Sequence, residues 1–178
     1  MNDTERGIFL SLLTTQHLRA GDFIETSGKP TAHLIHVASG CIMSYYTDSD
    51  GVERVIQFAT AGWWTGDLHS LTTQQPSIFS TRALIDSDVV LLTQPSLQTV
   101  LEKIPRFEKY FRILFQNALV AHQHRIIQAY SATAEERYQT FREKFASLEQ
   151  YVPQKYIASY LGVTPEFLSK IRRRLMEK

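Results

Sequence analysis

The stretch that decides the fold is Gln154-Lys-Tyr-Ile-Ala-Ser-Tyr-Leu-Gly-Val-Thr-Pro-Glu-Phe-Leu-Ser-Lys-Ile-Arg-Arg173. Counted from Gln154, the fifth residue is Ala158 and the ninth is Gly162. A helix-turn-helix requires a small residue where its two helices meet. It also favours glycine in the turn, where the backbone is left-handed. The spacing therefore predicts a helix-turn-helix.

The second helix of this motif is predicted to begin after Thr164, a capping residue, with Pro165 in its first turn. Leu168, Ile171 and Leu175 recur three and four residues apart, which places them on one buried face. The other face carries polar and basic side chains, an arrangement that suits base contacts near the N-terminus and phosphate contacts beyond it. The residues predicted to contact DNA are Gln154, Thr164, Pro165, Glu166, Ser169, Lys170, Arg173 and Arg174.

An ordinary helical hairpin with a solvated basic face fits the same pattern. The distribution of charge along the chain helps to choose between this hairpin and a helix-turn-helix. The 178-residue chain has a net charge of +1. Residues 1–95 contain 5 Lys and Arg against 10 Asp and Glu, whereas residues 96–178 contain 14 against 8. An acidic first half and a basic second half indicate that only the second half meets a polyanion. We expect that partner to be double-stranded DNA.

The N-terminal residues and the cysteine content indicate a protein of a reducing compartment. Met1 leads into polar residues rather than into a basic start and an apolar run, so no signal peptide is predicted. No segment approaches the roughly 18 apolar residues of a membrane helix. The single Cys41 excludes a disulfide within one chain. We therefore expect a cytoplasmic protein that does not enter a membrane.

The sequence pattern between residues 18 and 95 is typical of a β-domain. Glycines separate short runs of β-forming residues, and Asp50-Gly51 between two of them is a strong hairpin signal. This pattern predicts a small antiparallel sandwich or roll, preceded by a short helix over residues 3–15. The predicted strands are residues 34–37, 41–46, 54–58, 78–84 and 89–92.

A long helix is predicted after this region. Residues 106–130 contain neither Pro nor Gly and place most of their apolar side chains on one broad side. Such a helix, about 37 Å long, either pairs with its twin across a dimer axis or is simply a long core helix. A further helix is expected from Thr133 to about Ser147. The predicted fold is α+β, with a sensing domain (1–105), a dimerisation helix (106–131) and a helix-turn-helix domain (132–178).

With these elements in order, the chain resembles the Crp/Fnr family of bacterial transcription regulators. The resemblance is carried by Leu18-Arg-Ala-Gly-Asp-Phe-Ile-Glu25, Gly62-Trp-Trp-Thr-Gly-Asp-Leu68, Ala134-Glu-Glu-Arg137 and the helix-turn-helix. It looks closest to the short members of Bacteroidetes that have little of the β-wing. It implies a cyclic nucleotide-binding-like β-roll (a double-stranded β-helix), a homodimer and a regulatory role without catalysis. RNA polymerase is a further implied partner.

Departures from the family pattern fall in the cassette that binds the cyclic phosphate. Gly66, Asp67 and Leu68 match its Gly-Glu-Leu start, but its Arg-Ser pair falls on Ser77-Ile78. Without that arginine a buried phosphate lacks its charge-assisted contact. We expect the roll to bind a small effector other than cyclic AMP, or none. The family's base-contacting positions fall on His122 and Gln123, which could equally be solvated or interfacial residues.

The DNA-binding part departs from the family as well. Its usual Arg-Glu pair and following Arg read here as Pro165, Glu166 and Lys170. Pro165 cannot contact a base as arginine would, and Lys170 lacks the bidentate fork of arginine. The β-wing is expected to be absent, which implies weaker and more salt-sensitive binding. A dimer would compensate by presenting two recognition helices about 34 Å apart.

Two other classes of function fit parts of the sequence. The first is a ligand-sensing or protein-interaction module with a degenerate helix-turn-helix. The second is a cupin-like metalloenzyme, since a β-roll here carries histidines. His33 and His36 would point to opposite faces of a strand, and no His-x-His…Glu arrangement is present. We therefore expect no catalytic residue, no metal and no certain cofactor.

Overall fold

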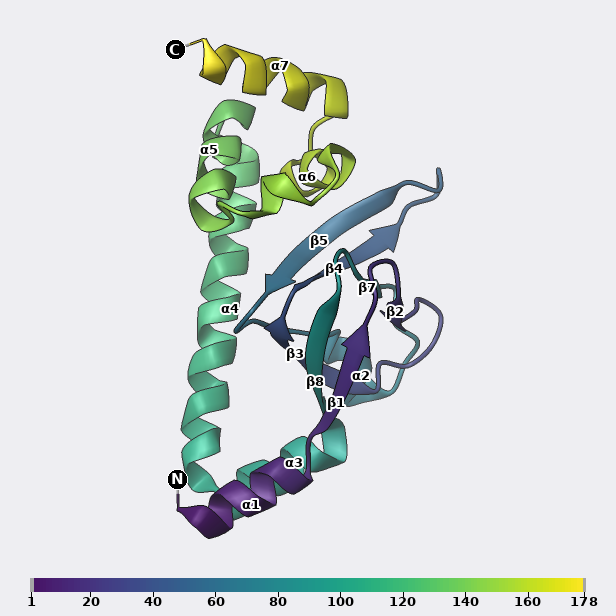
Figure 1. Ribbon diagram of the computed structural model, residues 1–178, viewed down its shortest axis with the longest axis vertical. Helices are drawn as coiled ribbons and strands as arrows, with labels where there is room; N and C mark the ends of the chain where they lie inside the picture. Colours follow the sequence, from purple (N-terminus) through teal and green to yellow (C-terminus); the bar gives the residue numbers. More distant parts are fainter. Residues whose placement is uncertain (1, 178) are drawn as a thin grey trace. The chain divides into compact units, whose positions relative to one another are not determined.

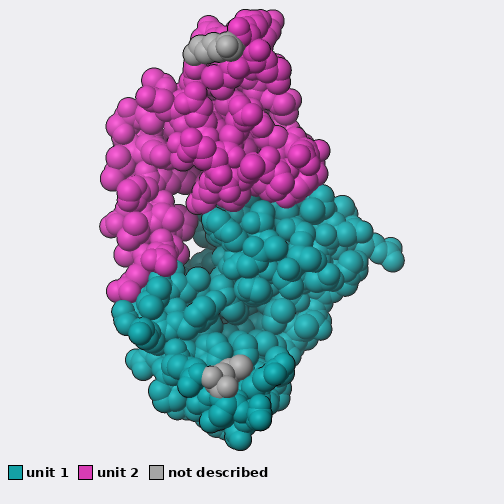
Figure 2. Space-filling model, turned by 60° about the vertical axis from the view of Figure 1, so that its left-hand side comes forward, with its two compact units in different colours: residues 1–46, 56–115 teal, residues 47–55, 116–178 magenta. Residues whose placement is uncertain are grey.

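A computed structural model describes residues 2–177. The chain forms two compact units, distinguished by colour in Figure 2. One comprises residues 1–46 and 56–115, and the other comprises residues 47–55 and 116–178. We call them the roll unit and the helix-turn-helix unit. Because the division falls within one long helix, the three-part domain organisation drawn from the sequence stays a prediction.

The roll unit is built on two four-stranded sheets with strand orders β1-β8-β3-β6 and β2-β7-β4-β5 (Figure 1). Each pairing for which a register is given is antiparallel. This confirms the predicted α+β fold with an antiparallel roll. The strands are β1 (Thr14–Leu18), β2 (Phe23–Glu25), β3 (His33–Ser39), β4 (Cys41–Thr47), β5 (Glu53–Thr60), β6 (Trp64–Thr65), β7 (Ser80–Ala83) and β8 (Ser87–Thr93).

Four helices begin in this unit. The first is shorter than expected: it ends at Ser11, and the next residues form β1, which pairs with β8. Thr14 and Thr15 are β-branched, and pairing with β8 outweighs the helical spacing of the residues before them. The helices are α1 (Asp3–Ser11), α2 (Leu68–Thr73), α3 (Gln94–Lys103) and α4 (Pro105–Ser131).

Alternating residues of the strands form the core of the roll. In β3 and β8, Ile35 lies opposite Leu91 and Val37 opposite Val89, and all four are buried. The apolar side chains are removed from water on the inner face, which is the main stabilising term for such a layer. The buried residues of this cluster are Leu18, Ile35, Val37, Ile42, Ala59, Ala83, Val89 and Leu91.

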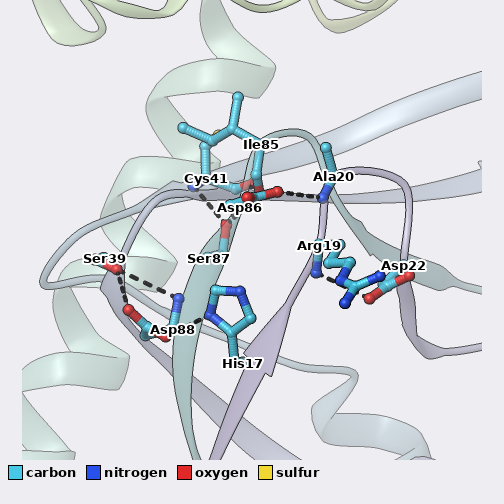
Figure 3. A network of polar contacts seen from close by, with 10 residues as sticks. All are labelled: His17, Arg19, Ala20, Asp22, Ser39, Cys41, Ile85, Asp86, Ser87 and Asp88. Carbon is cyan, nitrogen blue, oxygen red and sulfur yellow. Dashed lines mark hydrogen bonds and ion pairs between the residues drawn. The ribbon is translucent and has the colours of Figure 1, made fainter.

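The turn between β3 and β4 depends on glycine. Gly40 has φ +88°, and a Cβ at this position would lie 2.2 Å from Ser87 Oγ and 2.6 Å from the Asp86 carbonyl oxygen. Ser87 Oγ accepts a hydrogen bond from the Cys41 N–H at 3.0 Å. Figure 3 shows this hydrogen bond between Cys41 and Ser87. Only glycine fits here, both because of its φ angle and because of the space.

The helix-turn-helix unit contains the second part of α4, from residue 116, and the helices that follow it. Thr133 and Glu136 form a capping box at the start of the first of these. They are α5 (Ala134–Lys144), the short 3-10 helix η1 (Leu148–Gln150), α6 (Gln154–Leu161) and α7 (Pro165–Met176). The predicted long helix and helix-turn-helix are thus confirmed. Among residues 2–177 no helix is long and apolar enough to cross a membrane.

Candidate nucleic-acid interface and effector site

The turn between α6 and α7 has the geometry that the sequence predicts. Gly162 ends α6 with φ +69° and ψ +36°, in the left-handed region. Its N–H donates to the Ser159 carbonyl oxygen at 3.1 Å, and the Val163 N–H donates to that of Ala158 at 3.0 Å. Ala158 is fully buried. The two helices can therefore meet closely at a fixed angle.

The recognition helix α7 begins as expected. Thr164 Oγ1 accepts a hydrogen bond from the Phe167 N–H at 3.2 Å, and Pro165 follows in the first turn. Leu168 and Ile171 are buried, which holds α7 on the rest of the unit. Leu175, expected in the same buried row, is only half-buried.

All of the side chains that the sequence assigns to DNA are exposed. Seven of them lie on α7 or its cap, and Gln154 begins α6. A hydrogen bond from its own backbone N–H, and then one from the Thr164 side chain, hold the pKa of Glu166 below its usual value, so this carboxylate stays ionised. The exposed residues are Gln154, Thr164, Pro165, Glu166, Ser169, Lys170, Arg173 and Arg174.

Sequence reasoning missed what anchors α7 from behind. Glu149 in η1 accepts a hydrogen bond from the Tyr138 hydroxyl. The same carboxylate pairs with Arg142 at 3.3 Å and with Arg172 at 3.9 Å. Burial, followed by the Glu149 hydrogen bond, raises the pKa of Tyr138 to about 12. No short sequence pattern predicts this cluster, because its members come from α5, η1 and α7.

In the roll unit, the cassette residues form hydrogen bonds with one another. Asp67 Oδ1 caps α2 by accepting from the Ser70 N–H at 3.1 Å, and Asp67 Oδ2 accepts from Ser77 Oγ at 2.8 Å. Ser77 is buried, whereas Ile78 is 65% exposed. A Cβ on Gly66 would lie 3.1 Å from the His33 carbonyl oxygen. Leu68 is exposed. The structure thus brings Asp67 and Ser77 together but leaves Leu68 and Ile78 apart from them.

The charge at this place does not suit a phosphate. Burial raises the pKa of a second carboxyl group, that of Glu25, and the charge of Asp67 raises it further. The Glu25 carboxylate accepts hydrogen bonds from the N–H groups of Ala32 and His33. Arg82 lies over the ring of Tyr45, with its guanidinium carbon 5.1 Å from the ring centre. An added anion would therefore meet two carboxyl groups here.

His122 and Gln123 are adjacent residues of α4 and point in different directions. At about 100° per residue, Gln123 shares a face with Leu119, Ile126 and Tyr130, all exposed apolar residues. His122 lies about 100° from Gln123 around the helix. Burial lowers the pKa of His122, and the charges of Arg125 and Lys144 lower it further. The two residues that the sequence assigns to one effector contact therefore point in directions about 100° apart.

Residues 2–177 hold no group of three His, Cys, Asp or Glu placed to bind a metal ion. A cluster of Ser39, Asp88 and His17 is visible in Figure 3. His17 Nδ1 donates to Asp88 Oδ1 at 2.8 Å, and Ser39 Oγ donates to Asp88 Oδ2 at 2.8 Å. The hydroxyl thus bonds the carboxylate and not the imidazole, unlike a nucleophile with its base. These bonds tie β1 and β3 to β8.

Comparison with known proteins assigns the family. The cyclic nucleotide-binding domain matches residues 15–104, which is 90 of the 178 residues. The chain belongs to the cyclic nucleotide-binding domain family. The matched segment runs from β1 to the end of α3, so the family domain is the β-roll of this structure.

Proteins similar to this chain extend the likeness beyond the β-roll to the helix-turn-helix. The fumarate and nitrate reduction regulatory protein of Vibrio cholerae is 25% identical over 90% of this chain and 68% of its own. FixK2 of Bradyrhizobium japonicum has a TM-score of 0.78 and 21% identity, over 93% of this chain and 85% of its own. A Eubacterium rectale protein assigned to the Crp/Fnr family has a TM-score of 0.73 and 19% identity, over 99% and 84%. The Crp/Fnr resemblance is thereby confirmed.

Proposed function

We propose that this chain is a DNA-binding transcriptional regulator of the Crp/Fnr type that acts as a homodimer. The observation that carries the proposal is the exposed polar face of α7. It is presented by a glycine turn and fixed behind by buried Leu168 and Ile171. This geometry fits the major groove of B-form DNA, which is wide enough for one α-helix.

The exposed residues of α7 divide by the chemistry of their contacts. Glu166, ionised and in the first turn, suits the amino group of cytosine, and Lys170 suits the acceptors of guanine. Arg173 and Arg174, in the last turn, suit phosphates. Phosphate contacts supply affinity that falls with salt, whereas the two base contacts supply sequence preference.

The proposed dimer contact is an apolar face on the second part of α4. Its residues cover an arc of about 120° at 100° per residue, and Gln123 lies among them. A polar residue in such a seam fixes the register of two paired helices. The exposed apolar residues are Leu119, Val120, Ile126, Ile127 and Tyr130, the last 89% exposed. A second copy of α4 would remove them from water.

The effector and the setting of the regulator are further parts of the proposal. The carboxyl groups of Glu25 and Asp67 disfavour cyclic AMP, so the roll takes another small molecule or none. We place the protein in the cytoplasm, where its DNA lies, with RNA polymerase as a further partner. DNA binding and regulation account for the exposed polar groups of α7, and we propose no catalytic activity.

Fluorescence anisotropy with a duplex selected by the wild-type protein tests the DNA contact. We expect Lys170→Ala with Arg174→Ala to abolish binding. The loss of the phosphate contact of Arg174 alone should flatten the slope of log affinity against log salt by about 1. The matched control removes two exposed basic residues of the roll unit, through Arg6→Ala and Lys29→Ala, and should bind normally. Equal affinity of both double variants would contradict the proposed contacts of α7, whereas a wild-type protein that selects no duplex would favour a ligand-sensing module without DNA binding.

A further inference from the structure

Strand β5 lies at the edge of its sheet, with β4 as its neighbour. The outer side of an edge strand presents N–H and C=O groups that no further strand pairs. Val55 in this strand is nevertheless only 2% exposed. Its backbone groups therefore need partners within the protein. The partners that we find come from two helices of the helix-turn-helix unit, to which residues 47–55 also belong.

The Ser159 side chain of α6 takes the place of a neighbouring strand. Its Oγ accepts from the Val55 N–H at 2.9 Å and donates to the Glu53 carbonyl oxygen at 2.9 Å. Both distances are those of well-formed hydrogen bonds. Glu53 and Val55 are alternate residues, so their outward groups lie on the same edge. One hydroxyl thus pairs with two outward groups of β5.

Arg125 of α4 completes the contact. Its Nη2 donates to the Val55 carbonyl oxygen at 3.3 Å and lies 3.5 Å from that of Tyr160. Its guanidinium carbon lies 4.3 Å from the centre of the Tyr160 ring, a cation–π arrangement. Arg125 therefore holds α4, β5 and α6 together at one point. Tyr160 directly follows Ser159, so both contacts act on the same turn of α6.

We propose that Ser159 and Arg125 are positioning residues that fix the first helix of the helix-turn-helix to strand β5. The proposal deepens the DNA-binding function argued above and rests on it. β5 runs without a break from Glu53 to Thr60, and its residues from 56 onward belong to the roll unit. The contact leaves the polar face of α7 exposed. It therefore fixes α6 to residues 53–55 without covering the face of α7 that is proposed to bind DNA.

Amide hydrogen exchange of the free protein tests the contact itself. We expect Ser159→Ala to speed exchange of the Val55 amide by about tenfold, because a buried N–H loses its acceptor. Ser159→Thr keeps a hydroxyl and should keep the protection. Ser147→Ala removes a hydroxyl that makes no capping bond and should change nothing. The buried amides of Leu168 and Ile171 report global unfolding. An unchanged Val55 rate in Ser159→Ala would overturn the proposal.

The distance between two spin labels tests positioning without DNA. Asp50→Cys and Met176→Cys place labels on the exposed hairpin and the exposed end of α7, while the native Cys41 is buried. We expect a narrow distance distribution that broadens in Ser159→Ala and in Arg125→Gln, and that Ser159→Thr restores. An equally narrow distribution in Ser159→Ala would mean that the contact adds stability alone, and would overturn the positioning role.

DNA affinity links the contact to function. On the duplex that the wild-type protein selects, Ser159→Ala should lower the ratio of full-site to half-site affinity by about tenfold, because two loosely held helices lose effective concentration. Half-site affinity should not change. A rise in full-site affinity would instead make the contact inhibitory and contradict the proposal. If no duplex is selected, the DNA-binding function fails, whereas the exchange and distance measurements still decide the contact.

Discussion

The Asp67 carboxylate accepts a hydrogen bond from the buried Ser77 hydroxyl at 2.8 Å, and its other oxygen caps α2. One side chain therefore joins the start of a helix to a segment ten residues further along. At the position where the Crp/Fnr pattern has arginine, this chain therefore has a serine that bonds the protein's own carboxylate. This relationship accounts for the first two predictions.

Asp67→Ala should lower the free energy of unfolding by about 2 kcal/mol, since a helix cap and the acceptor of a buried hydroxyl are both lost. Asp67→Asn keeps an oxygen at the cap and should cost less, about 1 kcal/mol. Urea denaturation followed by circular dichroism measures both. No loss of stability in Asp67→Ala would show that neither hydrogen bond matters.

Cyclic AMP should not bind with micromolar affinity. The reason is electrostatic: no arginine occupies the position of Ser77, and the carboxyl groups of Asp67 and Glu25 are near enough to each other for the charge of Asp67 to raise the pKa of Glu25. Isothermal titration calorimetry on the full chain measures this directly. Heat that saturates at micromolar cyclic AMP would contradict the account of the roll.

Two glycines with almost the same φ angle form a matched pair. Gly28 has φ +86° with nothing within 4 Å of an added Cβ, whereas at Gly40 that atom would lie 2.6 Å from the Asp86 carbonyl oxygen. Gly28→Ala should cost about 1–2 kcal/mol, the strain of a left-handed alanine. Gly40→Ala should cost about 4 kcal/mol or more, because backbone must move. Similar unfolding midpoints for both variants would contradict this distinction.

The cluster around Glu149 should give the helix-turn-helix unit a dependence on alkaline pH. The pKa of Tyr138 is raised from its ordinary 10.0 to about 12. Its contribution to stability is therefore fully present below pH 10 and is lost as pH rises towards 12. Denaturation of the wild type and of Tyr138→Phe at several pH values isolates it. The advantage of the wild type should shrink over this range, and a constant difference would contradict the role of the hydroxyl.

The apolar face of α4 predicts the oligomeric state. Leu119→Glu with Ile126→Glu places two charges in the proposed seam and should yield monomers, because buried like charges repel and lose hydration. Asn117→Glu with Ala121→Glu alters exposed positions outside that face and should leave the dimer intact. Analytical ultracentrifugation distinguishes the two results. A wild-type monomer at all concentrations would rule out the proposed seam.

Local chemistry explains which features the sequence could predict. The positions of Gly162 and Thr164 follow from rules that act within a few residues, and the structure has the turn and cap they predict. The end of α1 was missed because it depends on pairing between Thr14 and Leu91, which are far apart in the chain. The Glu149 cluster and the contact of Ser159 with Val55 are likewise set by tertiary packing. No spacing rule reaches across 104 residues.

The measurement that tests the central claim most directly is selection of duplexes from a random pool by the wild-type protein. The account predicts an inverted repeat whose half-site centres lie about 34 Å apart, one turn of DNA. Its binding should weaken steeply with salt and be lost on replacing Lys170 and Arg174. A pool with no enriched sequence, or binding that does not respond to salt, would contradict the claim that α7 reads DNA.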